Sequence, residues 1–219
     1  MEYMVINNIL SDKQYGFIKG KSTVMQLLKV LDEWTSLLEQ GGQIDVIYTD
    51  LEKAFDKVHH DILIHKLKMI KINDKVLAWI INFLKHRRQR VKIEDECSDW
   101  TPVVSGIPQG SVLGPLLFII YINDMVKASQ NGSEVYLYAD DSKIFRYIKD
   151  EKDAISLQND LCFIVDWINK NILKLNIDKC KIISYGRVTC KYDYKIKNTI
   201  LERIDKIKDL GVVFDSKLK

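Results

Sequence analysis

The chain has 219 residues, of which 47% are hydrophobic and 29% are charged, and its formal net charge is +3. These values are typical of an ordinary soluble protein rather than of a disordered or fibrous chain, and the length can bury a core as one domain or two joined subdomains. The small net charge means that any attraction to nucleic acid must come from local basic patches.

Nothing in the sequence predicts secretion or a membrane span. The cysteines lack the C-x-x-C spacing of metal and redox sites and the N-terminus has no signal pattern, so we expect reduced thiols. The cysteines are Cys97, Cys162, Cys180 and Cys190, and Cys162 lies in a helical pattern that places it in the core. The longest apolar run, residues 112–122, is short for a membrane helix and contains Gly114 and Pro115. The sequence therefore predicts an intracellular soluble chain.

In chain order, the first strong pattern is a helix that begins after Ser22, a residue suited to an N-cap. Its expected apolar stripe ends before Gly41-Gly42 and consists of Val24, Leu27, Leu28, Leu31 and Leu38. A strand over residues 44–50 follows and ends on Asp50. Because ligands commonly gather at the C-terminal ends of strands, Asp50 is a candidate site residue. The alternative is that Asp50 caps a helix beginning at Leu51.

The middle of the chain combines helices, a basic run and a turn-rich loop. Helical patterns cover residues 62–70 and 76–84, and the basic run Lys85–Lys92 follows directly. This run is either a patch for a nucleic-acid backbone or a solvated face. Residues 105–111 contain two glycines around a proline, a loop whose backbone a ligand could approach closely. A structural turn before the helix predicted over residues 112–126 is the plain alternative.

Residues 135–145 predict a β-hairpin with two adjacent acids, Asp140 and Asp141, at its tip. Two carboxylates at a tight turn repel each other, and neither can be buried without a partner. They form either a solvated turn, since Asp is a common turn residue, or a platform for a divalent metal ion. Strands are also expected over residues 173–185 and 210–215, after a helix marked by Leu157, Leu161, Ile164, Val165 and Ile168.

The order of these elements predicts an α+β fold with no clear internal boundary. Asp50 and Asp140 both lie at strand ends, where neighbouring strands of one sheet would bring them together. Carboxylate oxygens suit Mg²⁺, which keeps water ligands and takes the others from substrate phosphates. Two such ions about 4 Å apart would activate a 3′-hydroxyl and stabilise a departing pyrophosphate.

The histidines do not predict a metal site. His60 and His65 are five residues apart on a helical pattern, and no cysteine or third ligand completes a zinc set. Together with His59 and His86, they are expected at the surface or at helix caps.

Three motifs occur in a fixed order: Tyr48–Asp56, Ser105–Pro115 and Tyr138–Asp141. Gln14–Phe17 precedes them and Leu210–Val212 follows. In this combination the chain resembles the reverse transcriptases of non-LTR (LINE-type) retrotransposons, in the jockey/CR1-like direction. The resemblance covers nearly the whole chain, and the ordered set of motifs is far more specific than any one of them.

The resemblance implies catalytic roles for four residues of a polymerase palm. Asp50, Asp140 and Asp141 match the carboxylates that hold Mg²⁺, with Mn²⁺ as a substitute, and Asp50 and Asp140 match the direct ligands. Lys179 matches a lysine that protonates the leaving pyrophosphate. The plain alternative for Lys179 is a surface lysine of a basic segment.

The resemblance also implies contacts to substrates. Phe55 would close over the sugar 2′ position and select deoxynucleotides, although on sequence alone it could be a core aromatic. The loop at Pro108, Gln109 and Gly110 would contact the nascent base pair and the template strand. Lys19 and Lys21 would contact phosphates. Further nucleic-acid contacts are expected from Arg87, Arg88, Arg90, Leu210 and Gly211.

By this resemblance, residues 1–219 form a reverse transcriptase domain, with partial fingers over 1–43, mainly palm over 44–219, and a primer-grip-like hairpin near 205–215. Ile18 departs from the family, which often has Arg there. A thumb is expected to be absent, so we expect a truncated chain whose thumb and endonuclease segments belong to a longer parent polyprotein. The expected partners are an RNA template, a DNA primer and dNTPs, without a membrane, in the nucleus and cytoplasm.

The sequence leaves two main functional interpretations. The first is an RNA-directed DNA polymerase domain that extends a primer with dNTPs. The alternative is a catalytically inactive truncated or domesticated remnant that binds RNA or a partner. An RNA-templated RNA polymerase shares the palm chemistry, but Phe55 and Ala139 disfavour it.

Overall fold

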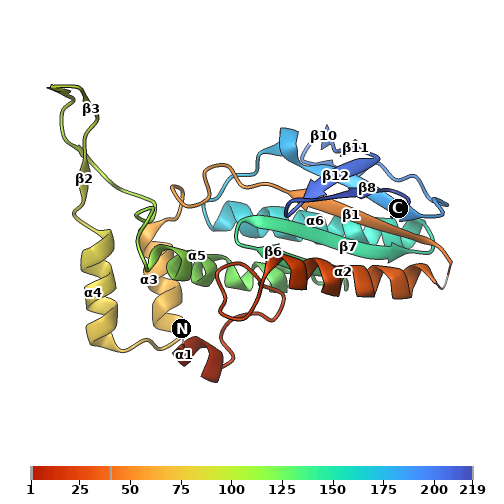
Figure 1. Cartoon of the computed structure of the whole chain (residues 1–219), viewed down its shortest axis with the longest axis horizontal. Coiled ribbons are helices and arrows are strands. Elements are labelled where there is room, and N and C mark those ends of the chain that lie inside the picture. The colour runs from red at the N-terminus through yellow and green to blue at the C-terminus, as the bar shows by residue number, and fades with distance from the viewer. Residues whose placement is uncertain (1, 40, 219) are drawn as a thin grey trace. The chain divides into compact units, whose positions relative to one another are not determined.

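The strand predicted before Asp50 lies at the centre of a five-stranded sheet. In the computed structural model, which describes residues 2–39 and 41–218, this strand is β1 (Gln43–Thr49). The sheet has the order β11-β8-β1-β7-β6 (Figure 1). Its other strands are β6 (Glu134–Tyr138), β7 (Asp141–Ile148), β8 (Lys181–Gly186) and β11 (Glu202–Arg203). The nearly continuous burial along β1 is typical of a strand that is covered on both faces.

The register of the sheet brings distant parts of the sequence to one edge. β1 pairs antiparallel with β7 and β8, and β6 pairs antiparallel with β7. Thr49 lies opposite Ser142, and Tyr48 lies opposite Lys181. The C-terminal end of β1 therefore meets the beginnings of β7 and β8. The prediction that adjacent strands carry Asp50 and the Asp140-Asp141 hairpin is confirmed.

The first long helix, α2 (Thr23–Leu38), begins as predicted, because the Ser22 Oγ accepts a hydrogen bond from the Met25 N–H at 3.2 Å. The predicted apolar stripe is partly wrong, since Val24 is 61% exposed and Leu28 is 62% exposed. The residues that α2 buries are Gln26, Leu27, Val30 and Trp34. The helix turns this face toward the sheet because the face carries Trp34, the largest side chain of the helix.

Trp34 forms the centre of the hydrophobic core on this side of the sheet. The side chain is fully buried, and its ring centroid lies 4.7 Å from that of Tyr185 and 5.7 Å from that of Phe145. A hairpin of β12 (Lys206–Asp209) and β13 (Val212–Asp215) covers the same side, with the ring of Phe214 6.2 Å from that of Trp34. The hairpin predicted near residues 205–215 is therefore present.

The helix α6 (Glu151–Lys170) packs along β7 and lies behind the sheet in Figure 1, whereas α2 lies in front. Its apolar buried residues are Ala154, Leu157, Leu161, Ile164 and Ile168. Cys162 is exposed, so its predicted core position is wrong. The residue follows Leu161 on the helix and turns away from the buried stripe, because successive residues are about 100° apart.

The strand predicted over residues 173–185 begins only at Lys181. The preceding segment instead pairs with the chain that leaves β1: the Asn176 N–H donates to the Asp50 carbonyl at 2.9 Å, and the Glu52 N–H donates to the Lys174 carbonyl at 2.7 Å. A short 3₁₀ helix, η2 (Ile177–Lys179), then leads into β8. Farther along, β9 (Lys195–Ile196) and β10 (Thr199–Ile200) form a small separate ladder.

Three further helices confirm the other helical predictions with small shifts: α3 (His60–Met69), α4 (Asp74–Leu84) and α5 (Gly114–Ile122). A short helix at the start of the chain, α1 (Glu2–Ile6), was not predicted. The helix predicted over residues 112–126 begins at Gly114, and its last part is the 3₁₀ helix η1 (Asn123–Ala128). Between α4 and α5, the chain forms a hairpin from β2 (Arg88–Gln89), β3 (Lys92–Ile93), β4 (Glu96–Cys97) and β5 (Thr101–Pro102).

The chain divides into two compact units. The helical unit contains the first ten residues and Lys53–Ile122, and the sheet unit contains Ser11–Glu52 and the chain from Asn123 onward. The expected division into fingers over residues 1–43 and palm over residues 44–219 stays a prediction. Among the helices of the described residues, none is both long enough and apolar enough to cross a bilayer.

Candidate active site

Three acidic side chains gather at one edge of the central sheet. Asp50 directly follows β1, Asp140 lies in the turn between β6 and β7, and Asp141 is the first residue of β7. Because Thr49 pairs with Ser142, Asp50 and Asp141 come next at the same end of the two strands. Leu51 forms a β-bridge with Leu175 and residues 52–57 form turns rather than a helix, so the helix-cap interpretation of Asp50 is wrong. Lys53 contributes to this, since its φ of +49° is outside the right-handed helical region.

The turn that carries Asp140 is held in place by the segment before α2. The Gln14 side chain is fully buried, and its Oε1 accepts hydrogen bonds from the N–H groups of Ala139 at 3.1 Å and Gly16 at 2.6 Å. A Cβ added to Gly16 would lie 2.3 Å from the Ala139 nitrogen, so only glycine fits there. The motif around Gln14 thus has a structural task that the sequence alone did not reveal.

The carboxylates at this edge repel one another. Burial raises the pKa of Asp140, and the nearby Asp50 carboxylate raises it further. Burial also raises the pKa of Asp141 to about 6, with further contributions from the carboxylates of Asp140, Asp209 and Asp50. Such a cluster favours the approach of positive charge.

Lys179 supplies one positive charge to this cluster. Its Nζ lies 3.4 Å from the Asp50 Oδ2, and its side chain is 66% exposed. The lysine reaches this position because η2 follows the backbone hydrogen bond between Asn176 and Asp50. The structure therefore brings together Lys179 and Asp50, which are far apart in the sequence.

A groove of about 370 Å³ runs beside the acids. Its lining includes Asp50, Asp141, Lys143, Lys179, Asp209 and Leu210. Lys143 and Asp209 form an ion pair whose side chains are only 2% and 5% exposed, and this pair joins β7 to the β12–β13 hairpin. Leu210 thus faces the groove from the hairpin turn, and the exposed Gly211 completes that turn with a φ of +91°.

The helical unit carries a second group of predicted site residues. The Phe55 ring stacks on Phe118 of α5, with the centroids 4.2 Å apart and an interplanar angle of 17°. The Ile107 N–H donates to the Phe55 carbonyl at 3.0 Å, and the Gln109 Nε2 donates to the Asp56 Oδ1 at 3.0 Å. The turn at Phe55 and the loop at Pro108–Gly110 are thereby fixed to each other.

Gly106 is the point at which this loop is fastened. Its φ is +84°, and an added Cβ would meet the Asp56 carbonyl oxygen at 2.9 Å. Its carbonyl oxygen lies 2.8 Å from the His60 Nε2 and accepts a hydrogen bond from the Arg87 Nη2 at 2.8 Å. His60 is only 5% exposed, so the prediction of a surface or capping histidine is wrong: its ring turns inward to this carbonyl.

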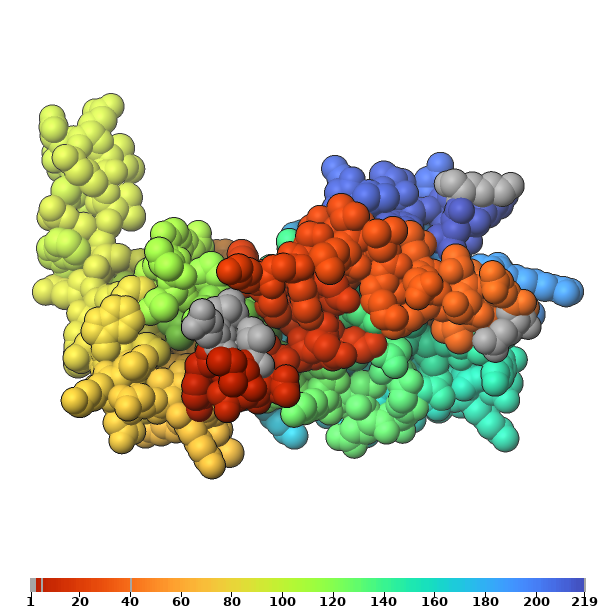
Figure 2. All heavy atoms as spheres, turned by 60° about the horizontal axis from the view of Figure 1, so that its bottom comes forward, coloured from red at the N-terminus to blue at the C-terminus, as the bar shows by residue number. Residues whose placement is uncertain are grey.

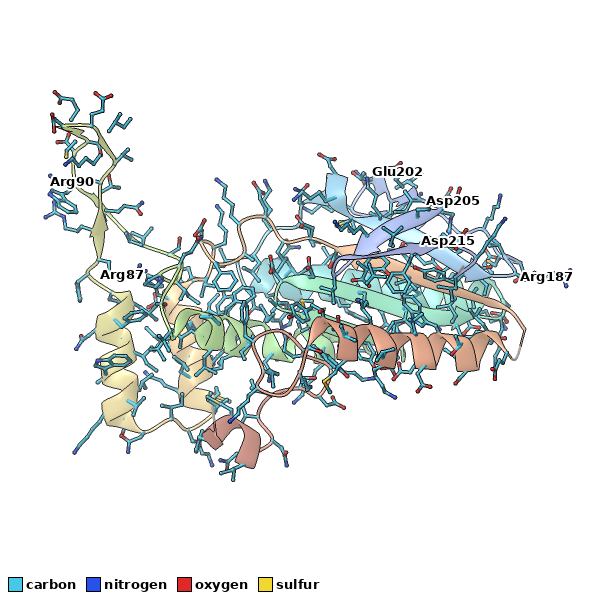
Figure 3. All side chains as sticks on the ribbon, in the orientation of Figure 1. Arg87, Arg90, Arg187, Glu202, Asp205 and Asp215 are labelled. Atoms are coloured by element: carbon cyan, nitrogen blue, oxygen red, sulfur yellow. The ribbon has the colours of Figure 1, made fainter. Side chains whose placement is uncertain are left out.

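The three predicted nucleic-acid arginines separate into two groups. Arg87 is half-buried and also donates to the Leu84 carbonyl at 2.9 Å, so its guanidinium holds the loop rather than facing solvent. Arg88 and Arg90 are exposed on the hairpin between α4 and α5. Figure 3 shows Arg87 at the base of this hairpin and Arg90 farther out.

The helical unit also contains a cavity of about 540 Å³ beside the loop. Its lining includes Lys53, Asp56, Lys57, Arg87, Pro108 and Gln109. This lining has three cationic side chains, Lys53, Lys57 and Arg87, and one acidic side chain, Asp56, so the cavity suits an anionic ligand. Gly110 is exposed, and an added Cβ there would meet open space.

The two predicted phosphate-binding lysines lie in the sheet unit. The Lys21 Nζ donates to the carbonyls of Asp12 at 2.5 Å and Gln14 at 2.8 Å, so it is bound to its own loop. Lys19 is exposed.

The chain matches the family model described as reverse transcriptase (RNA-dependent DNA polymerase) over residues 1–214. The chain belongs to the reverse transcriptase family. The motifs quoted from the sequence fall within this match, so the resemblance stated from the sequence is confirmed.

Within the reverse transcriptases, the chain is similar to those of jockey-like mobile elements. The chain is 29% identical over 230 residues to the "Probable RNA-directed DNA polymerase from transposon BS" of Drosophila melanogaster, covering 99% of this chain and 25% of the relative. It is 26% identical over 235 residues to the RNA-directed DNA polymerase from mobile element jockey of the same species, covering 100% of this chain and 26% of the relative. The expected kinship with jockey-like non-LTR elements is confirmed. The chain spans about a quarter of the length of these relatives.

Solved structures confirm the predicted α+β polymerase fold. The apo telomerase from Candida tropicalis, truncated from its C-terminal domain, superposes with a TM-score of 0.67 at 13% identity, covering 93% of this chain and 39% of the telomerase chain. The Candida albicans telomerase in complex with a TWJ fragment of telomeric RNA gives a TM-score of 0.68 at 13% identity, covering 98% of this chain and 35% of the telomerase chain.

The donor set of this reverse transcriptase fits a hard divalent cation. Asp50 and Asp140 present carboxylate oxygens, and the repulsion at Asp140 and Asp141 would be relieved by positive charge. Within residues 2–39 and 41–218, no group of three or more His, Cys, Asp or Glu side chains is already arranged around one metal position. Oxygen ligands supplied by substrate phosphates and water would therefore have to complete the coordination.

Replacing Asp141 by Asn is expected to stabilise the metal-free protein at pH 7.5 by about 1 kcal/mol, after a discount for the exposure of this side chain. The folded-state pKa of Asp141 is about 6 and its ordinary value is 3.8, so the wild type loses stability as the pH rises between these values. Thermal unfolding in EDTA should give a midpoint roughly 2–4 °C higher for Asp141→Asn at pH 7.5. The gain should vanish near pH 4.

The control for this prediction is Asp166→Asn, which removes one exposed negative charge from α6. It should leave the midpoint unchanged at every pH. An equal gain in both variants, or a gain that persists at pH 4, would show that repulsion at the sheet edge is not the cause.

Proposed function

We propose that this chain is the RNA-directed DNA polymerase domain of a non-LTR retrotransposon and adds dNTPs to the 3′-hydroxyl of a primer on an RNA template. One observation carries this proposal: Asp50, Asp140 and Asp141 lie at one edge of the sheet with Lys179 beside Asp50, in a chain of the reverse transcriptase family.

Asp50 and Asp140 would hold Mg²⁺, or Mn²⁺ in its place, through carboxylate oxygens. When bound, the divalent ions supply the charge that activates the attacking hydroxyl and stabilises the departing pyrophosphate. Asp141 raises the negative charge of the site. Lys179, held 3.4 Å from Asp50, would donate a proton to the pyrophosphate as it leaves.

The other residues would position the substrates. In the sheet unit, the turn with Leu210 and Gly211 would support the primer strand along the groove. In the helical unit, the loop at Pro108–Gly110 would contact the nascent base pair, and Phe55 would contact the sugar. Hydrogen bonds fix this loop to Phe55 and Asp56, which supports a role for the loop and Phe55 in positioning the same nucleotide.

Substituting Phe55 with Ala is expected to lower the preference for deoxynucleotides over ribonucleotides on the order of ten- to a hundredfold, because a flat ring next to the sugar excludes a 2′-hydroxyl. The ratio of kcat/KM for dNTP and rNTP incorporation measures this preference. Phe163→Ala, at an exposed phenylalanine of α6, serves as the control and should leave the ratio unchanged. An unchanged ratio in Phe55→Ala would remove the sugar-selecting role.

The experiment that tests the proposed function is primer extension by the 219-residue chain on a primed RNA template with dNTPs and Mg²⁺. The control is the double variant Asp140→Ala/Asp141→Ala. Extension that disappears in the control would establish polymerase chemistry on these acids. Binding of the primed template without any extension would instead identify a non-catalytic module.

A further inference from the structure

The hairpin between α4 and α5, residues 88–102, is a surface with no task in the proposed chemistry. We call it the arm. Its ladders pair Arg88 with Pro102, Gln89 with Thr101 and Lys92 with Cys97, and all of its side chains are exposed. It stands clear of the helices of its own unit (Figures 1 and 2). A two-stranded hairpin in water is only marginally stable, so this one keeps a large exposed surface without a core beneath it.

One face of the arm combines an aromatic ring with two arginines. Since Gln89 pairs with Thr101, Arg90 lies opposite Trp100, and Arg88 lies on the same face two residues away. The guanidinium carbons of Arg90 and Arg88 lie 4.7 Å and 5.8 Å from the centroid of the Trp100 ring. The Trp100 side chain nevertheless remains 50% exposed. The face therefore offers a flat ring next to two permanent positive charges.

The arginine charges on this face are available to a ligand. In the part of the chain that the structure describes, no acidic side chain forms a salt bridge with Arg88 or Arg90. By contrast, the neighbouring Lys85 pairs with Asp61 at 2.8 Å. The acidic residues of the arm lie mainly at its tip, at Glu94, Asp95 and Glu96, so a polyanion would be attracted to the base of the arm and repelled from its tip.

The geometry points to Arg88, Arg90 and Trp100 as a binding site for single-stranded RNA, an inference that rests on the proposed function for the source of that strand. The guanidinium groups bind phosphates, and the indole ring stacks on an unpaired base. A duplex hides its base faces and would engage only the arginines. Arg87 is not part of the site, because its guanidinium is bound to the carbonyls of Leu84 and Gly106.

The test is equilibrium binding of the 219-residue chain to a fluorescent 20-nucleotide single-stranded RNA and to a matched RNA duplex over a range of salt concentrations. Trp100→Ala should weaken single-strand binding roughly tenfold, with an unchanged salt dependence and no effect on the duplex. Trp100→Phe should keep most of the affinity. Arg88→Gln/Arg90→Gln should reduce the slope of log K against log salt by about 1.4, since each phosphate contact contributes about 0.7 on a single strand.

The matched control is Arg187→Gln, an exposed arginine that lies in the sheet unit (Figure 3). It should leave the affinity of both RNAs nearly unchanged. Equal losses in Arg187→Gln and Arg88→Gln/Arg90→Gln would overturn the site, as would a Trp100→Ala variant that binds the single strand like the wild type. Circular dichroism and limited proteolysis of Trp100→Ala would separate a lost contact from an unfolded arm, with Trp100→Phe as the reference, because Trp100→Phe keeps a ring for the arginines to pack against.

Primer extension measured on the same variants separates the two proposals. Wild-type extension together with full single-strand binding by Trp100→Ala would overturn the arm site alone. Loss of single-strand binding in Trp100→Ala, together with no extension by the wild type, would support the arm site and overturn the polymerase proposal.

Discussion

Substituting Asp50 with Asn is expected to reduce primer extension by roughly a thousandfold or more, while the affinity for primed template changes little. Asn has nearly the same shape as Asp but no charge, so the variant removes the negative charge at the end of β1 without a cavity. The proposed metal would lose a ligand, and Lys179, whose Nζ lies 3.4 Å from Asp50, would lose its partner. Single-turnover extension and template binding should be measured on the same preparation.

The matched control is Asp205→Asn, which removes an exposed carboxylate next to the β12–β13 hairpin (Figure 3). This variant should extend primers like the wild type. Extension by Asp50→Asn within tenfold of the wild type would remove Asp50 from the catalytic centre. Equal losses in extension and in template binding would indicate that Asp50 holds the nucleic acid rather than the reacting groups.

The sequence predicts the edge of the sheet well because the signals there are local. A run of β-branched residues marks β1, and aromatic residues on both sides of the Asp140 turn mark β6 and β7. These local signals place Asp50 and Asp140 at the ends of strands. Their meeting depended only on the pairing of β1 with β7, which the structure supplies.

Tertiary packing decides what the sequence pattern leaves open. In α2, Val24 and Leu28 fit the apolar period as well as Leu27, but the sheet accepts the face that carries Trp34. His60 shows the same limit in a polar group. The Nε2 of its ring contacts the backbone carbonyl of Gly106, which is 46 residues away in the sequence. No sequence pattern predicts a contact of this kind.

The buried pair of Lys143 and Asp209 is another feature with no signal in the sequence. Lysine inside a strand usually marks a solvated face, yet this side chain is only 2% exposed because Asp209 of the hairpin lies above it. A single substitution in this pair is therefore expected to have a large effect on stability.

Replacing Lys143 with Met is expected to destabilise the protein by about 3–5 kcal/mol, because the carboxylate of Asp209 would remain buried without its counter-charge. In a domain of this size, the midpoint temperature of thermal unfolding should fall by roughly 10 °C. The double variant Lys143→Met/Asp209→Leu should recover most of this loss, since an apolar pair of similar volume needs no desolvation of charge. Chemical denaturation of the two single variants and the double variant gives the coupling energy directly.

Lys208→Met is the control, since Lys208 is an exposed lysine on β12 directly before Asp209. Its effect should stay within about 0.5 kcal/mol of zero. A double variant as unstable as Lys143→Met would show that Lys143 acts through the shape of its side chain or through Asp141 rather than through Asp209. If the double variant regains stability and also extends primers, apolar contact is enough to hold the hairpin against the sheet. If it regains stability but not extension, the charge of Lys143 has a role in the groove beyond holding the hairpin.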